Sequence, residues 1–335
     1  MQLLRILAFP FSLIYALALY IRNVLYDSGI LQSKEFKTPI VSVGNLSTGG
    51  TGKTPMIEWL LSHLSADSKL AVLSRGYKRK TRGFVLAQIT STAEEIGDEP
   101  LQIYSKFPKV SVAVDADRIR GIKLLETLKH PNLILLDDAF QHRKVRPLFS
   151  ILLTSYGKLY TNDWYLPTGN LRDNKNSSKR ADLIVVTKCP PELDDESQLK
   201  ITRVLNPGKD QKVLFCNLEY DNDLKGEKEK ISLDALLDKE VTLVTGIANP
   251  KPLIDFLRSA GITFDHREYR DHHYFSGKEI DFFNSKPLIL TTEKDYMRLK
   301  DRVDNLYYIS VRHRFLNKGD VVITKSLEKL GYRFL

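Results

Sequence analysis

Cysteine is scarce in this chain. The 335 residues include only Cys189 and Cys216, and neither belongs to a CxxC pair or to a spacing typical of zinc ligands. Small disulfide-stapled domains and structural zinc modules both need more cysteine than this. The cysteine content therefore favours a reducing compartment with free thiols.

Long uncharged runs are also rare, and no internal repeat or low-complexity tract is visible. One run stands out, ILAFPFSLIYALALYI at residues 6–21, with 16 residues bracketed by Arg5 and Arg22. It is short for a full membrane span. Three interpretations are open: an interfacial helix whose apolar face enters lipid, a helix packed on the protein's own core, and a cleaved signal peptide.

Acidic residues are outnumbered, which leaves a net charge of +9. The basic residues gather in three clusters, at residues 69–82, 143–146 and 172–180. Such clusters favour anionic partners, namely phosphorylated ligands, acidic lipids or nucleic acid. Each cluster taken alone could equally be a solvated loop. Hydrophobic residues at 42% are sufficient for a globular fold, and the length suits two domains.

Short apolar runs alternate with helical patterns along the first half of the chain. This alternation predicts an α/β fold with a parallel sheet covered by helices on both faces. Strands are expected at 39–43, 69–74, 110–114, 133–137 and 149–153, and helices at 55–64 and 118–128. The predicted division is a membrane-interface helix at 1–24, a nucleotide-binding domain at 25–155, a polar connector at 156–180 and a second, smaller α/β domain at 181–335.

A glycine-rich loop lies between the first predicted strand and helix. Gly52-Lys53-Thr54 ends it, and Pro55 suits the first helical turn. This context is typical of a P-loop, in which backbone N–H groups surround a phosphate, lysine reaches the β- and γ-phosphates and the hydroxyl binds Mg²⁺. The usual first glycine is Ser47 here. The predicted nucleotide-binding residues are Ser47, Thr48, Gly49, Gly50, Thr51, Gly52, Lys53 and Thr54.

Three further groups carry candidate chemistry. The buried strand LILLDD places Asp138 at its carboxyl end, where a carboxylate reaches Mg²⁺. Gly97–Pro100 contains Asp98, a candidate base, and Glu99, which could reach the metal; the proline should hold Glu99 out of helical geometry. Two adjacent histidines at 272–273 should face opposite ways in a strand, and one could pair with a carboxylate. The phosphate loop also favours an interfacial helix over a signal peptide, because ATP chemistry belongs in the cytosol.

Several motifs resemble one known family in their order. They are GNLSTGGTGKTP, SRGYKRK, GDEP, DDAFQH, LPTGNLRD, TGIANP, DHHYF and TEKD. Together they are similar to the tetraacyldisaccharide 4'-kinases of lipid A biosynthesis, enzymes associated with the inner membrane of Gram-negative bacteria. The resemblance covers nearly the whole chain.

This resemblance implies a P-loop kinase that transfers the γ-phosphate of ATP to the 4'-hydroxyl of a tetraacylated glucosamine disaccharide 1-phosphate. It implies an aspartate–histidine dyad of Asp98 and His272, with Lys53 as a further catalytic residue. ATP and Mg²⁺ are the implied cofactors. The metal ligands would be Thr54, Asp138 and Glu99. The substrate-binding residues would be Tyr77, His142, Arg172 and Asp173.

The implied location is the cytoplasmic face of the inner membrane, on an anionic surface, with no nucleic acid and no obligate protein partner. Asp173 stands where the family commonly has glutamate, which changes the reach of that carboxylate. The alternative is a P-loop ATPase or GTPase switch that acts on a protein partner. Thr48 weighs against the first, because many such ATPases have lysine there, and Pro190 weighs against the second, because guanine recognition needs an aspartate there.

Overall fold

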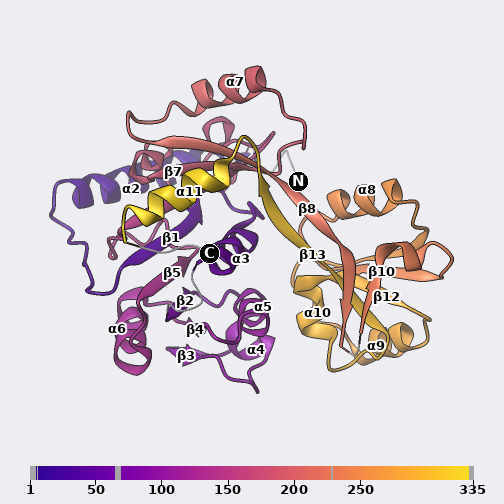
Figure 1. Ribbon diagram of the computed structural model, residues 1–335. Coiled ribbons are helices and arrows are strands. Elements are labelled where there is room, and N and C mark those ends of the chain that lie inside the picture. Colours follow the sequence, from indigo (N-terminus) through magenta and orange to yellow (C-terminus); the bar gives the residue numbers. More distant parts are fainter. Residues whose placement is uncertain (1–4, 6, 65–68, 228, 332–335) are drawn as a thin grey trace.

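The computed structural model describes residues 5, 7–64, 69–227 and 229–331. Figure 1 shows two lobes of unequal size joined by two long strands. One sheet of 13 strands runs through both lobes, in the order β11-β10-β12-β13-β8-β7-β6-β1-β5-β2-β4-β3, and β9 pairs with β8. The α/β class with a large parallel sheet, a smaller second α/β part and an apolar N-terminal helix is thereby confirmed.

The larger lobe contains most of the parallel strands. Its elements are α2 (Phe9–Asp27), β1 (Ile40–Asn45), α3 (Lys53–His63), β2 (Leu70–Ser74), β3 (Val85–Leu86), α4 (Ala93–Ile96), α5 (Asp98–Lys106), β4 (Ser111–Val114), α6 (Arg118–Lys129), β5 (Leu133–Asp137), β6 (Phe149–Ser155), β7 (Leu183–Thr187) and α7 (Asp195–Leu205). Within the described residues, the connector at 156–180 forms only two short 3₁₀ turns, Tyr160–Asn162 and Lys175–Arg180.

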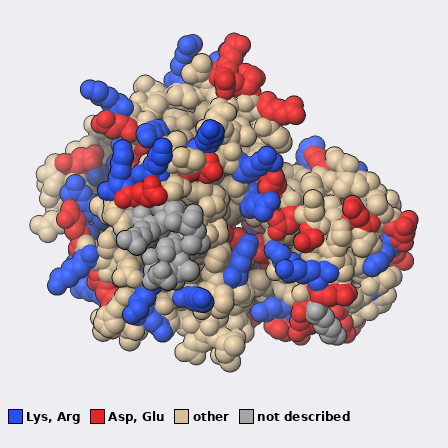
Figure 2. All heavy atoms as spheres, in the orientation of Figure 1, with Lys and Arg blue, Asp and Glu red and all other residues tan. Residues whose placement is uncertain are grey.

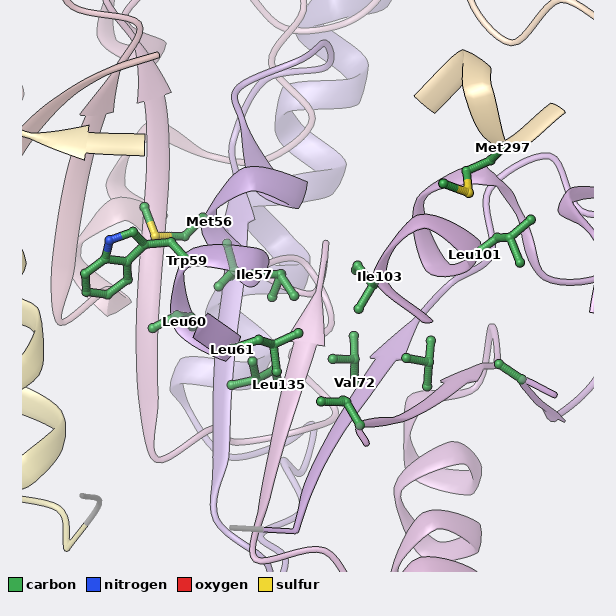
Figure 3. Packing of buried hydrophobic residues seen from close by; sticks show 14 of the residues in the cluster. Met56, Ile57, Trp59, Leu60, Leu61, Val72, Leu101, Ile103, Leu135 and Met297 are labelled. Carbon is green, nitrogen blue, oxygen red and sulfur yellow. The ribbon is translucent and has the colours of Figure 1, made fainter. Parts of the chain in front are cut away.

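Helices cover both faces of this sheet, as the alternation predicts. On β1, Val41 and Val43 pack with α3 and α5, whereas Ile40 packs with α6 on the opposite face. Strands β2 and β5 divide their residues in the same way, because successive side chains of a strand point to opposite faces. Figure 3 shows Leu61 of α3 beside Leu135 of β5, both members of the same buried cluster. Each fully buried Leu or Ile stabilises the fold by roughly 1.5–3 kcal/mol.

The smaller lobe follows, with β9 (Lys230–Ser232), β10 (Val241–Thr245), α8 (Lys251–Ser259), β11 (Phe264–Glu268), α9 (Gly277–Asn284), β12 (Ile289–Thr292) and α10 (Glu293–Leu299). Strands β8 (Lys212–Gly226) and β13 (Leu306–Phe315) run antiparallel and join the lobes. The chain ends with α11 (Gly319–Glu328).

The lobes do not divide the chain at residue 181. Strand β7 pairs with β6, and the first residues of β8 pair with β7, so both continue the larger lobe's parallel sheet. After β13 the chain returns to the larger lobe, where Asn317 donates a hydrogen bond to Asp195 of α7 at 3.0 Å. The apolar runs in this part of the sequence are ordinary buried strands, and nothing in their composition distinguishes one lobe from the other.

The N-terminal helix does not bury its apolar side in the protein. Among the residues of α2, only Ser12, Leu19 and Asn23 are buried. Residues 1–4 and 6 of the predicted membrane-interface helix lie outside the described residues. Within the described part of the chain, α2 is the one helix long and apolar enough to cross a membrane.

Candidate active site

The glycine-rich loop connects the carboxyl end of β1 to the start of α3, where open α/β sheets bind ligands. Gly49 and Gly52 have φ values of +110° and +84°, which favour glycine. A Cβ on Gly52 would also lie 2.8 Å from the ring of His313. That ring's Nε2 donates to the Gly52 carbonyl oxygen at 2.9 Å, so a strand that joins the lobes supports the loop.

The connector braces the same loop from its other side. Thr48 donates its backbone N–H to the Asn170 carbonyl at 2.8 Å, and Ser47 forms an isolated bridge with Leu171. This backbone pairing explains how serine is accommodated at a position where most P-loops have glycine.

Lys53 and Thr54 open α3, directly after the loop. Lys53 Nζ lies 3.7 Å from Asp138 Oδ1, and Arg172 donates a hydrogen bond to Asp138 Oδ2 at 3.0 Å. Burial would raise the pKa of Asp138, but Lys53 and Arg172 outweigh it and lower the pKa to about 2. Asp138 is therefore ionised at neutral pH, a state that metal binding by a carboxylate requires.

The neighbouring Asp137 differs sharply from Asp138. It is buried, its Oδ2 accepts a hydrogen bond from Ser74 at 2.9 Å, and its buried Oδ1 has no hydrogen-bond partner among the described residues. Burial, and then the charges of Glu99 and Asp138, raise the pKa of Asp137 to about 7. A buried carboxylate oxygen without a hydrogen-bond partner, close to other carboxylates, is a candidate ligand for a cation.

Oxygen ligands of this kind fit Mg²⁺, which uses one or two carboxylates together with phosphate oxygens and water. Among the described residues no cluster of three or more His, Cys, Asp and Glu side chains is close enough to hold a metal by itself. The donor set therefore suits a cation that arrives with a nucleotide better than one held permanently by the protein.

Asp98 and His272 come together across the two lobes, 174 positions apart in the chain. His272 Nδ1 lies 2.7 Å from Asp98 Oδ2, and both side chains are largely buried. Burial by itself would raise the pKa of Asp98, but the hydrogen bond from His272 and two positive charges on α10 outweigh it, so the pKa is lowered. The pair thus contains an ionised carboxylate held by an imidazole.

Two local expectations around this pair are wrong. Glu99 is helical, because Pro100 occupies the third position of α5, and the first helical turn tolerates a residue without an N–H. The two histidines do not lie in a strand. His272 occupies a turn with φ +62°, and His273 turns away to Glu279, 3.1 Å from its Oε1.

The four predicted substrate-binding residues form two groups: three lie near His272 or Asp138, and the fourth, Asp173, contacts α2 instead. Tyr77 is exposed, and its ring centroid lies 5.2 Å from that of His272. Arg172 contacts Asp138, as described above. His142 lies in the loop after β5, which also contains Asp138. Burial, and then the positive charges of Arg118 and Arg75, lower the pKa of His142 to about 4.

Asp173 belongs to the second group. Its carboxylate is fully buried and accepts hydrogen bonds from Asn23 of α2 at 2.9 Å and from Arg180 at 3.1 Å. These contacts fasten the N-terminal helix to the connector. The carboxylate thus has protein partners in place of an open face toward the site.

The sequence as a whole is similar to proteins of one family. A family model described as tetraacyldisaccharide-1-P 4'-kinase, LpxK, matches residues 4–329. The chain belongs to this family.

The relatives named tetraacyldisaccharide 4'-kinase include one from Flavobacterium johnsoniae, 48% identical over 326 residues, which covers 95% of this chain and 94% of that protein. Another, from Bacteroides thetaiotaomicron, is 42% identical over 311 residues and covers 87% and 82%. A crystal structure of LpxK from Aquifex aeolicus in complex with ATP superposes with a TM-score of 0.80 at 30% identity, covering 95% of this chain and 97% of that chain.

Sequence reasoning about this kinase missed Asp137, Lys294 and Arg298. Asp137 was adjacent to the predicted ligand, and the burial of LILLDD was the available signal. Lys294 belongs to the motif TEKD, which had no predicted role, and its Nζ lies 3.0 Å from His272 Nε2. Arg298 lies 3.1 Å from Asp98, a contact between residues 200 positions apart that no local pattern indicates.

Proposed function

We propose that the protein transfers the γ-phosphate of ATP to the 4'-hydroxyl of tetraacyldisaccharide 1-phosphate, with Mg²⁺, in lipid A biosynthesis. The observation that carries the proposal is the Asp98–His272 pair beside a phosphate loop. Lys294, which lies 3.0 Å from His272 Nε2, is also 3.8 Å from Glu99 Oε1. The charges of Glu99 and of the loop's Lys53 both act on Asp137. Family membership supports the same reaction.

On the phosphate side, the backbone of residues 47–52 and the ammonium of Lys53 would hold the β- and γ-phosphates. Thr54 and Asp138, with Glu99 and Asp137, would hold the Mg²⁺, which when bound neutralises developing charge on the phosphates. The protein therefore supplies position and charge more than covalent chemistry.

On the hydroxyl side, Asp98 would accept the proton of the 4'-hydroxyl. The 4' oxygen then forms its bond to the γ-phosphorus while the bond from that phosphorus to the bridging oxygen breaks, and the electron pair stays on ADP. His272 holds the carboxylate by its Nδ1 hydrogen bond. Tyr77, His142 and Arg172 would contact the sugar and its phosphate.

The route of a lipid to this site would run along α2. Its protein-facing side is polar: the Ser12 hydroxyl contacts Thr168, the Tyr15 hydroxyl donates to the Arg172 carbonyl at 3.2 Å, and Asn23 reaches Asp173. Its outer side is apolar and exposed, at Phe11, Leu13, Ile14, Leu17, Tyr20, Ile21 and Val24. Such a helix suits insertion into the membrane boundary.

We infer that the protein sits on the cytoplasmic face of the inner membrane, with this face in lipid and the site next to the headgroups. Figure 2 shows lysine and arginine interspersed with acidic residues on the face drawn, and basic side chains on both sides of the hollow between the lobes. The basic side chains beside this hollow favour the binding of an anionic substrate there. The mixed charges elsewhere on the face drawn differ from the uniformly basic surface that binds membranes electrostatically.

The test is a phosphate-transfer assay. The full-length protein in detergent or vesicles is incubated with Mg·ATP and tetraacyldisaccharide 1-phosphate, and the mass of the lipid is measured by mass spectrometry. A lipid product heavier by one phosphate, absent with Lys53→Met, supports the proposal. ATP hydrolysis that is indifferent to the lipid would indicate the switch ATPase instead.

A further inference from the structure

Helix α10 brings two cations to the Asp98–His272 pair from the smaller lobe. Lys294 and Arg298 are four residues apart, so both lie on one side of this helix. Lys294 Nζ lies 3.0 Å from His272 Nε2 and 3.2 Å from Asp271 Oδ1. Arg298 Nη2 lies 3.1 Å from Asp98 Oδ2, and its Nη1 donates to the His273 carbonyl at 2.6 Å.

The position of the histidine depends on the same segment. Thr292 caps α10 and donates to Asp295 Oδ2 at 2.7 Å, and that oxygen accepts the backbone N–H of Gly246 at 2.8 Å. The Gly246 carbonyl in turn accepts the backbone N–H of His272 at 3.1 Å, where the backbone has a positive φ. A Cβ on Gly246 would lie 2.9 Å from Asp295 Oδ1, which explains the glycine.

Three sequence motifs therefore have one structural purpose. TGIANP supplies Gly246, DHHYF supplies His272, and TEKD supplies the cap and Lys294. Their hydrogen bonds hold the imidazole at the boundary between the lobes, where it contacts Asp98 of α5. None of these contacts involves the phosphate loop directly.

The contacts also decide where the imidazole carries its proton. A lysine ammonium has three donors and no acceptor. The Nε2 that faces Lys294 must therefore be the acceptor, which leaves the single proton of a neutral imidazole on Nδ1. That proton points to Asp98 Oδ2, and Arg298 faces the same oxygen. Asp98 Oδ1, which has no hydrogen bond within the described residues, is left to accept the substrate's proton.

We propose that Lys294 is a positioning residue for the phosphate transfer: it fixes the Nδ1–H tautomer of His272 and so the orientation of the Asp98 carboxylate. Arg298 supports the same arrangement from the other side. The inference rests on the proposed function, because it assigns Asp98 the role of base.

Removal of Lys294 leaves Nε2 without a donor. Asp98 still attracts the proton to Nδ1, but Nε2 now faces Asp271 Oδ1 at 3.6 Å, so a proton on Nε2 has an acceptor as well. The imidazole proton then exchanges between the two nitrogens, and only the Nδ1–H form bonds Asp98. The carboxylate loses its fixed orientation for part of the time, while the phosphate loop is untouched. Groups that orient a catalytic residue in this way typically change activity by about 10- to 100-fold.

The experiment compares Lys294→Met with Lys294→Arg and with Lys278→Met, an exposed lysine of α9 outside the cluster. Full-length protein labelled with ¹⁵N in its histidines is studied by long-range ¹H–¹⁵N NMR, and His272→Gln assigns the His272 signals. We expect one Nδ1–H tautomer in the wild type and in Lys278→Met, and averaged tautomer shifts in Lys294→Met. We expect Lys294→Arg to restore the wild-type spectrum, because it keeps a donor facing Nε2.

Kinetics gives the second readout. Lys294→Met should lower kcat by about 10- to 100-fold with the KM for ATP within about twofold of wild type. An unchanged tautomer in Lys294→Met, or a KM for ATP that rises as much as kcat falls, would overturn the proposal. Should Lys294→Met not fold, Lys294→Gln is read by the same spectrum. A wild type that transfers no phosphate contradicts the function alone, because the tautomer is measured without turnover.

Discussion

The two sides of the active site are built in different ways. The phosphate side is a continuous loop, residues 47–54, together with two aspartates at the end of the adjacent strand β5. The hydroxyl side consists of Asp98 from the larger lobe and His272 from the smaller one, held by α10. The comparison teaches that the proposed nucleotide site is drawn mainly from one lobe, whereas the proposed base meets its histidine only when both lobes are in contact.

The largest expected effect separates these two sides directly. Lys53→Met should lower turnover by roughly 10³-fold and weaken Mg·ATP binding, because it removes a cation from the phosphates. Asp98→Asn should lower turnover by a similar factor, roughly 10³-fold, with Mg·ATP affinity unchanged. Calorimetric titration of each variant measures the affinity. Weaker Mg·ATP binding by Asp98→Asn would contradict the separation of the site into a phosphate side and a hydroxyl side.

The second prediction concerns Asp137, on the phosphate side. Its raised pKa, about 7 against an ordinary 3.8, means that ionisation opposes folding, and this cost grows as pH rises from about 4 to 7. Asp137→Asn should therefore raise the free energy of unfolding at pH 8 by roughly 1–3 kcal/mol, and much less at pH 4. Activity should fall on the order of 10²-fold, because a proposed Mg²⁺ ligand is lost.

Thermal melts of Asp137→Asn at both pH values check this. The amide oxygen can still accept the hydrogen bond from Ser74, so the comparison isolates the charge. Equal or lower stability at pH 8 would contradict the assignment of a buried, costly carboxylate.

The third prediction concerns the contact between the lobes. Lys106 on α5 bridges Glu58 of α3 at 2.6 Å and Glu293 of α10 at 3.1 Å. Burial, then the charge of Glu58, raises the pKa of Glu293 to about 7, while Lys106 opposes this. A raised carboxyl pKa means stability falls as pH rises toward 7, and without Lys106 the fall is steeper.

Lys106→Met should thus lower the free energy of unfolding by about 1–3 kcal/mol at pH 8 and by less at pH 5.5, measured by urea unfolding. Lys200→Met is the matched control, because Lys200 pairs with Glu196 at 2.7 Å on the exposed face of α7. That variant should change stability by less than about 0.5 kcal/mol. An equal loss of stability in both variants would contradict a role for the Lys106–Glu58–Glu293 contacts in stabilising the lobes against each other.

The smallest effect on the chemistry is expected at α2. A triple Ile14→Ser, Leu17→Ser and Ile21→Ser variant should bind vesicles of anionic lipid roughly tenfold or more weakly in flotation assays, since it removes apolar surface. Its melting temperature should hold, because these side chains are exposed. Leu237→Ser, also exposed but in the smaller lobe, is the control. Undiminished binding of the triple variant would contradict a lipid-facing helix.

Sequence reasoning could predict a phosphate side because its signal is local. A strand, a glycine-rich loop and a helix follow one another within about 25 residues, and each element has its own pattern. The alternation of apolar residues likewise predicted the two-faced sheet, and the strands and helices expected in the first half are present.

The hydroxyl side could not be reached in the same way. The pairing of Asp98 with His272 came from resemblance, and the geometry of Glu99 and of the two histidines was expected wrongly. A proline in a first helical turn and a non-glycine residue at positive φ both depend on surrounding contacts. Arg298 and Lys294 reach the pair only because β8 and β13 set one lobe against the other.

The most direct test of the whole account is the position of the transferred phosphate. Wild-type protein with Mg·ATP should place one phosphate on the 4' oxygen of tetraacyldisaccharide 1-phosphate, located by tandem mass spectrometry, and none on the matched 4'-deoxy analogue. A phosphate at another oxygen, or equal phosphorylation of the 4'-deoxy analogue, would contradict it.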